Sequence, residues 1–508
     1  MLLYSLLASP FLAAILLAVL PGSARKIALP FSLLLAAVIT IISAVALVDG
    51  SLLTVALPWF VLPGTSATVH FALYSDGLAA WMMLLTSVLT FSSLWVSARS
   101  IGDRFSIFAS LVFVMQGAIF GCFLASDAVL FFFFFELLVP PAAILIAAFG
   151  GPARKRAAIL FSTFTLLGSA PMAVALWAIA AWTGTTAGSE IATALGTIDP
   201  KAVTLLFWGF AIAFAVKTPL FPFHGWQADS YAEAPAGVTA LLSGAMAKVG
   251  IFGFLRWTLP LFPQDILHYG QLFTALGVLT VIYGSLVALR QTDMKRVLAF
   301  SSLAHLGLAV IGCFTLYQSA IDGVVLMMVA HGLSAGALFL LAALPEQWKN
   351  TRNLGSFGGL ASKSPLFSAL FMIACMAAVA VPGSLGFVAE FLILQGIWQT
   401  MGPWIALAAG LSAILSAAYT LRLVQKLLFG KAEGSVGHDA HGHATPAFEG
   451  GPEIRRSEAL AIVPLVLALF VLGIAPSLVL RSIDPSTRNA PTAVASATSE
   501  TDTNATPR

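Results

Sequence analysis

The chain has 508 residues, of which 59% are apolar and only 9% are charged, with 25 Lys and Arg against 22 Asp and Glu. Soluble globular proteins carry charges on roughly 25% of their residues, so this composition excludes a soluble enzyme. It also excludes a disordered chain, and the net charge of +3 gives no indication of nucleic-acid binding. Long apolar runs without period-two alternation predict an all-α, polytopic membrane protein rather than an outer-membrane barrel.

The first apolar run covers residues 2–22 and is followed by Arg25 and Lys26. A signal peptide has the reverse order, with its positive charge before the apolar run. We therefore predict a retained first span whose N-terminus lies outside.

About 14 segments of the chain approach the roughly 20 apolar residues that a helix needs to cross a bilayer. In chain order the predicted spans are 2–22, 28–48, 76–98, 105–125, 128–149, 157–182, 203–231, 236–258, 271–290, 297–316, 319–343, 364–398, 404–428 and 459–480. With the N-terminus outside, most of the 25 Lys and Arg residues fall on the cytoplasmic side, as the positive-inside rule requires. The even count predicts both termini on the periplasmic side of a bacterial inner membrane.

The interior of the chain contains an inverted repeat. Residues 105–258 hold the fourth to eighth spans and residues 271–428 hold the ninth to thirteenth. An odd number of helices in each block makes the second block start on the opposite side from the first. Prolines interrupt the fourth helix of each block, at 217–222 and at 381–386. Paired broken helices predict a transport site at these two positions.

The rest of the chain divides into four segments. We predict an N-terminal three-helix segment, a cytoplasmic loop with histidines, a last transmembrane helix and a disordered tail, at 1–104, 429–458, 459–480 and 484–508. The loop carries His438, His441 and His443, which we expect to be solvated rather than to bind a metal. The three cysteines are far apart in apolar runs, and no C-x-x-C, G-x-G-x-x-G or Walker-type motif occurs.

Ionisable residues inside the spans are the candidate functional residues. A charge at the bilayer centre costs at least ~2.5–3.5 kcal/mol on insertion scales, so such residues need a reason to be there. Six protonatable residues stand out: Glu136, Lys217, Lys248, His305, His331 and Glu390. His224 follows the first break and either lines a path from the cytoplasm or lies in a solvated loop. A series of this kind suits protons better than bulky solutes.

Each candidate also has a plainer interpretation. Glu136 could serve only as a hydrogen-bonded packing residue, Lys217 could snorkel to an interface, and Lys248 could belong to a structural charge pair. Lone histidines in helices are often packing residues too. For Lys217 we favour the functional interpretation, because the adjacent break frees backbone carbonyls that can solvate an ammonium in the membrane.

Several motifs resemble the proton-pumping, antiporter-like subunits of respiratory complex I. They are Lys217-Thr-Pro-Leu-Phe-Pro-Phe-His-Gly-Trp, Ala232-Glu-Ala-Pro-Ala-Gly, Lys248-Val-Gly, Asp293-Met-Lys-Arg-Val-Leu-Ala-Phe-Ser-Ser-Leu-Ala-His305-Leu-Gly and His331-Gly. The resemblance covers about residues 70–430. Within the family, the motif Pro382-Gly-Ser-Leu-Gly-Phe-Val-Ala-Glu390-Phe resembles the subunit M branch, called chain 4 in mitochondria. Other branches typically place Lys at the position of Glu390.

This resemblance implies proton translocation driven by quinone reduction in neighbouring subunits. Glu136 would pair with Lys217, the central carrier; Lys248, His305 and His331 would lead on to Glu390 as the exit-side group. The chain itself would hold no redox cofactor or metal, with NAD(H), FMN, iron–sulfur clusters and quinone in partner subunits. Its partners would be those membrane subunits and the lipid bilayer, with no nucleic acid.

Other assignments remain open from the sequence. The same motifs also resemble those of subunits of multi-subunit cation/proton antiporters, membrane hydrogenases and bicarbonate-uptake complexes. Glu390 in place of Lys favours complex I over the antiporters. A membrane scaffold without conduction would leave six intramembrane ionisable residues unexplained.

Overall fold

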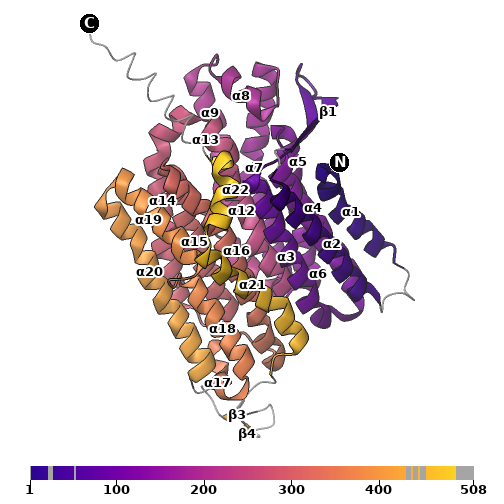
Figure 1. Ribbon diagram of the computed structural model, residues 1–508, viewed down its shortest axis with the longest axis vertical. Coiled ribbons are helices and arrows are strands. Elements are labelled where there is room, and N and C mark those ends of the chain that lie inside the picture. Colours follow the sequence, from indigo (N-terminus) through magenta and orange to yellow (C-terminus); the bar gives the residue numbers. More distant parts are fainter. Residues whose placement is uncertain are drawn as a thin grey trace.

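The computed structural model describes residues 2–20, 27–50, 53–430, 436–438, 444–446 and 453–487. Most of these residues are helical, and the helices pack side by side in one bundle (Figure 1). This confirms the predicted all-α fold class. A helix satisfies its backbone hydrogen bonds within itself, which a segment surrounded by lipid must do.

The N-terminal part consists of three long helices and a hairpin. The helices are α1 (Leu2–Ala18), α2 (Ala28–Asp49) and α3 (Gly77–Ile101). Between α2 and α3, strand β1 (Leu53–Val61) pairs antiparallel with β2 (Thr68–Ser75), an element that the sequence prediction lacks. The hairpin lies at one end of the bundle, at the top of Figure 1.

The first block contains the first broken helix. Its elements are α4 (Phe105–Leu124), α5 (Ala128–Leu137), α6 (Val139–Phe149), α7 (Arg154–Thr183), α8 (Gly188–Leu195), α9 (Pro200–Lys217), α10 (Gln227–Glu233), α11 (Ala236–Leu241), α12 (Ala247–Gly253) and α13 (Leu259–Leu261). The helix ends at Lys217 and resumes at Gln227, where the prolines predict the break. Two π-helical turns, η3 (Leu242–Met246) and η4 (Phe254–Thr258), join α11, α12 and α13.

The predicted second block follows in the chain. It contains α14 (Pro263–Arg290), α15 (Met294–Phe314), α16 (Gln318–Lys349), η5 (Leu354–Ser356), α17 (Leu360–Lys363), α18 (Pro365–Ala378), α19 (Leu385–Met401), α20 (Pro403–Val424) and η6 (Gln425–Phe429). Its fourth helix is also broken at the predicted place, between Ala378 and Leu385.

The C-terminal part comprises β3 (Val436–His438), β4 (Ala444–Pro446), α21 (Arg456–Ile474) and α22 (Ser477–Thr487). Of the three loop histidines, His438 ends β3, whereas His441 and His443 lie outside the described residues. Helix α22 extends to Thr487, into the segment for which the sequence predicts disorder, and residues 488–508 lie outside the described part.

Eleven helical segments of the described residues are long and apolar enough to cross a membrane, and α1, α18 and α19 are shorter apolar helices. One of the eleven, Gly77–Leu124, contains both α3 and α4, so the number of crossings stays a prediction. The segments Ala236–Leu261 and Gln318–Lys349 are 100% buried inside the protein, against 28% for α2. Lys248 and His331 belong to these inner segments, which therefore shield them from lipid.

Candidate functional site

Lys217 is the last residue of α9, at the break. Its side chain is buried, with Nζ 3.4 Å from the carbonyl oxygen of Phe135 and 4.4 Å from the centre of the Phe135 ring. The last carbonyls of a helix lack intrahelical donors and carry partial negative charge. The break, the carbonyl and the aromatic face thus stabilise an ammonium without a direct counter-ion.

Glu136 does not form the direct ion pair with Lys217 that the family resemblance implies. Its Oε1 is buried and has no hydrogen-bond partner, while Lys217 donates to the carbonyl of Phe135 instead. The carboxylate still lies close enough to interact electrostatically with Lys217, and Cys122 lies within range of both groups. Glu136 therefore acts on Lys217 through space in this structure.

Lys248 and His331 are in direct contact. The Nζ of Lys248 lies 2.6 Å from Nδ1 of His331 and 2.6 Å from the carbonyl oxygen of Ser243. Ser243 belongs to the π turn η3, and such a turn interrupts the regular i→i−4 hydrogen bonding and recurs at functional sites. At this distance one of the two nitrogens donates a hydrogen bond and the other accepts it.

His305 and Glu390 continue the series beyond His331. The ring centroids of His305 and His331 are 5.5 Å apart. Nδ1 of His305 lies 2.8 Å from the carbonyl of Ser301, which fixes a hydrogen on Nδ1, and Nε2 faces Glu390. That Nε2 is 3.6 Å from Oε1 of Glu390, roughly half an ångström beyond hydrogen-bond range.

A small void of about 10 Å³ lies beside the two histidines. Ser301, Ser302 and Ser334 line it together with His305 and His331. This volume is about that of one water-sized probe, and a buried water needs two to four polar partners, which these side chains offer. A single water here would connect the two imidazoles.

Several polar residues of the site were not predicted from the sequence. The hydroxyl of Ser243 lies 3.0 Å from that of Ser302, and Ser301 donates to the hydroxyl of Tyr419 at 3.0 Å. Tyr231 donates to the carbonyl of Leu242 at 3.2 Å. Their position inside predicted spans was the available signal, but it does not distinguish them from the many other hydroxyl groups there.

His224 stands apart from this series. It stacks on Phe221, with centroids 5.5 Å apart, and lies edge-on to Tyr283 at 4.8 Å. Its Nδ1 is buried without a hydrogen-bond partner. The structure thus shows no hydrogen-bonded connection between His224 and the other predicted residues, among those it describes.

The first break and the inner helix α12 meet at a glycine. A Cβ at Gly250, two residues after Lys248, would come within 2.8 Å of the backbone nitrogen of Thr218 and 3.0 Å of the carbonyl of Phe214. Helix α12 therefore packs directly on the end of α9. No hydrogen bond joins Lys217 to Lys248 in the part of the chain that the structure describes.

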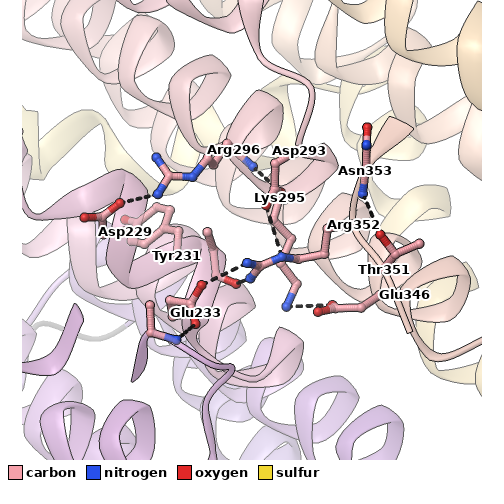
Figure 2. Close-up of polar contacts among 12 residues, drawn as sticks. Asp229, Tyr231, Glu233, Asp293, Lys295, Arg296, Glu346, Thr351, Arg352 and Asn353 are labelled. Atoms are coloured by element: carbon pink, nitrogen blue, oxygen red, sulfur yellow. Dashed lines mark hydrogen bonds and ion pairs between the residues drawn. The ribbon is translucent and has the colours of Figure 1, made fainter. Parts of the chain in front are cut away.

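A cluster of charges ties the two blocks together at the ends of α10, α15 and α16 (Figure 2). This inter-repeat cluster consists of Asp229, Glu233, Asp293, Lys295, Arg296, Glu346 and Arg352. Arg352 contacts Glu233 at 2.8 Å and Asp293 at 3.0 Å, and it also donates to the carbonyl of Ala232. Glu233 belongs to the first block and Asp293 to the second, so one guanidinium bridges both.

Two further ion pairs extend the cluster. Lys295 contacts Glu346 at 2.8 Å, and Arg296 pairs with Asp229. Burial lowers the pKa of the Arg352 guanidinium, but the hydrogen bond to Glu233 and the nearby carboxylates outweigh it, so the pKa is raised above its usual value. Arg352 therefore stays charged.

Broken helices around a buried Lys–His–Glu series define an antiporter-like membrane subunit. A family model described as "NADH:quinone oxidoreductase/Mrp antiporter, TM" matches residues 125–416, more than half of the chain. The chain belongs to this family, and within it to the antiporter-like membrane subunits of complex I, as the motifs predict.

The relatives agree with this placement. The chain is 34% identical to NADH-quinone oxidoreductase subunit M of Rhodobacter capsulatus, over 82% of this chain and 81% of that one. It is similar to a chain of respiratory complex I from Thermus thermophilus, solved with bound NADH, at 31% identity, a TM-score of 0.85 and coverage of 97% and 100%. A chain of the Mrp complex from Dietzia sp. DQ12-45-1b shares the fold at 22% identity and a TM-score of 0.80, covering 97% and 99%.

Proposed function

We propose that this chain translocates protons in a complex I-type NADH:quinone oxidoreductase along Lys217, Lys248, His331, His305 and Glu390. The contact between Lys248 and His331 carries the proposal, because it joins the first block to the second within fully buried segments. His305 and Glu390 follow in order on the second block, at distances that one water or a small side-chain shift would close.

The proposed mechanism uses repulsion between neighbouring positive charges. In a buried site of low dielectric, two protonated groups a few ångströms apart repel strongly. A proton delivered to the Lys248–His331 pair therefore drives the proton already there toward His305. Glu136 adjusts how firmly Lys217 holds its proton, since the carboxylate interacts with it through space.

The driving reaction belongs to other subunits in this proposal. NAD(H), FMN, iron–sulfur clusters and quinone would be bound by partners, and this chain would supply only proton transfer. We place it in the inner membrane of a bacterium with both termini on the periplasmic side. The distribution of Lys and Arg along the sequence supports this orientation.

The test compares Lys217→Ala with Lys201→Ala, an exposed Lys at the other end of α9. Each tagged variant is isolated from its own membranes, its partners are identified by mass spectrometry, and NADH:quinone turnover and proton pumping are measured. We expect pumping to fall at least tenfold in Lys217→Ala, because positioned acid–base groups contribute about 10²–10⁴. Lys201→Ala should behave as the parent does.

Two results would contradict the proposal. Unchanged pumping in Lys217→Ala would remove Lys217 from the route. Recovery of the chain with antiporter or hydrogenase partners, and without NADH- and quinone-binding subunits, would show that a different reaction drives it.

A further inference from the structure

A cavity of about 590 Å³ lies beneath the β1–β2 hairpin. It is lined by the hairpin, α8 and the η4–α13 end of the first block, which gather at the same end of the bundle (Figure 1). We call it the hairpin cavity. Its polar lining includes His70, Tyr74, Ser126, Glu190 and Arg256.

Charged groups on the wall make this cavity suitable for water. Arg256 pairs with Asp76, whose side chain also accepts from the backbone nitrogen of Ala79 and caps α3. The guanidinium lies 5.4 Å from the centre of the Tyr74 ring. Arg256 thus anchors the hairpin to η4 and keeps a charge at the cavity wall.

Aromatic rings separate this cavity from Lys217. Trp257 lines the cavity, and its ring centroid is 5.3 Å from that of Phe131. The ring centroids of Phe131 and Phe135 are 5.7 Å apart, and Nζ of Lys217 lies 4.4 Å from the centre of the Phe135 ring. Phe214 packs on Phe131 and Phe135, at 5.9 Å from each. Phe131, Phe135, Phe214 and Trp257 form what we call the aromatic barrier.

The barrier is dry. Each of its four side chains is at most 2% exposed. Water avoids apolar cavities, and hydrophobic constrictions in channels block conduction by excluding it. A water-filled connection between Lys217 and the hairpin cavity would give the proton on Lys217 a second exit route.

We propose that the aromatic barrier insulates Lys217 from the hairpin cavity, so that a proton on Lys217 can leave only toward Lys248. This inference rests on the proposed role of Lys217. The barrier itself can be tested separately, because accessibility is measured without any pumping.

The native Cys122 is a buried reporter near Lys217. It is fully buried, precedes the cavity-lining Phe123, and lies within electrostatic range of Lys217. In a background with Cys313→Ala and Cys375→Ala, Cys122 is the single thiol of the chain. A small, anionic, membrane-impermeant methanethiosulfonate is applied to the assembled complex in spheroplasts and in inverted vesicles.

A second reporter shows which side the cavity faces. Ser189→Cys, in a chain without other cysteines, places a thiol at an exposed residue of the cavity lining. We expect this thiol to react in one preparation only. Cys122 should not react in either preparation while the barrier is intact.

Opening the barrier should expose Cys122 on the side where Ser189→Cys reacts. We expect Phe131→Ala to increase its labelling rate at least tenfold, and Phe131→Leu to increase it less. Phe108→Ala removes an equally buried ring from the same block, away from the barrier, and should leave the rate unchanged. Equal labelling in Phe131→Ala and Phe108→Ala, or reaction of Cys122 in the parent, would overturn the proposal.

A measurement of proton leak distinguishes failure of this proposal from failure of the proposed function. Passive proton permeability of proteoliposomes holding the complex should rise several-fold in Phe131→Ala and fall back when Lys217→Ala is added. If labelling accelerates but the leak does not depend on Lys217, the barrier is real and the assignment of Lys217 as a carrier is wrong.

Discussion

Replacing Arg352 by Ala should weaken the association of the two blocks at the inter-repeat cluster. The Arg352 side chain is 19% exposed, that of Asp293 is 21% exposed and that of Glu233 is 6% exposed. Asp293 can regain water, so its lost pair costs only about 0.2–1 kcal/mol. Glu233 is too buried to regain water, so the loss of its hydrogen bond to the charged Arg352 costs about 1.5–3 kcal/mol.

The expected loss of unfolding free energy is therefore about 2–4 kcal/mol. This loss is limited, because Oε2 of Glu233 still accepts a hydrogen bond from the backbone N–H of Ala153 at 2.8 Å. Thermal unfolding of the purified protein in detergent would measure the change. Arg352→Lys should lie between parent and Ala, since a single ammonium cannot bridge two carboxylates as a planar guanidinium does.

Arg290→Ala is the matched control, because it removes an exposed Arg at the end of α14. It should change the unfolding free energy by less than about 0.5 kcal/mol. If Arg352→Ala and Arg290→Ala unfold at the same temperature, the bridging role of Arg352 is wrong. Because the folded pKa of Arg352 is raised, its contribution to stability is complete below the ordinary pKa of an arginine side chain and is lost only as the pH rises through the higher folded value. The stabilisation by Arg352 should therefore stay constant from about pH 6 to 9.

Two other changes give equally direct tests. Gly250→Ala should lower expression of the folded chain, because the added Cβ meets the backbone of Thr218. Gly410→Ala is the control: it has open space around it and should be neutral or stabilising by up to about 1 kcal/mol. Equal yields of the two variants would refute the close packing at Gly250. Glu390→Gln keeps the size of the side chain but cannot take up a proton from His305, so pumping should fall while assembly is preserved, and normal pumping would exclude Glu390 from the route.

The predicted site rests on the scarcity of charges in the apolar spans. Because most spans have no ionisable residue, Lys248, His305, His331 and Glu390 could be singled out without any structure, and the fold brings them together from α12, α15, α16 and α19. The prolines likewise predict both breaks, since their effect on a helix is local.

Long-range geometry could not be predicted in the same way. The Arg352 bridge joins residues far apart in the chain, and no local pattern pairs them. The expected Glu136–Lys217 pair is absent because Phe135, the neighbour of Glu136, offers the ammonium its carbonyl and its ring. The β1–β2 hairpin escaped prediction because β1 is apolar on both of its faces, which hides the period of two.

The size of the void beside His305 and His331 has a consequence for ion selectivity. A space of about 10 Å³ admits one water, and a proton can pass it by exchange between that water and the imidazoles. A sodium ion would have to replace its hydration shell with several oxygen ligands, as selectivity filters do, and there is no room for them here. Along the proposed route, this point would therefore pass protons and exclude metal cations.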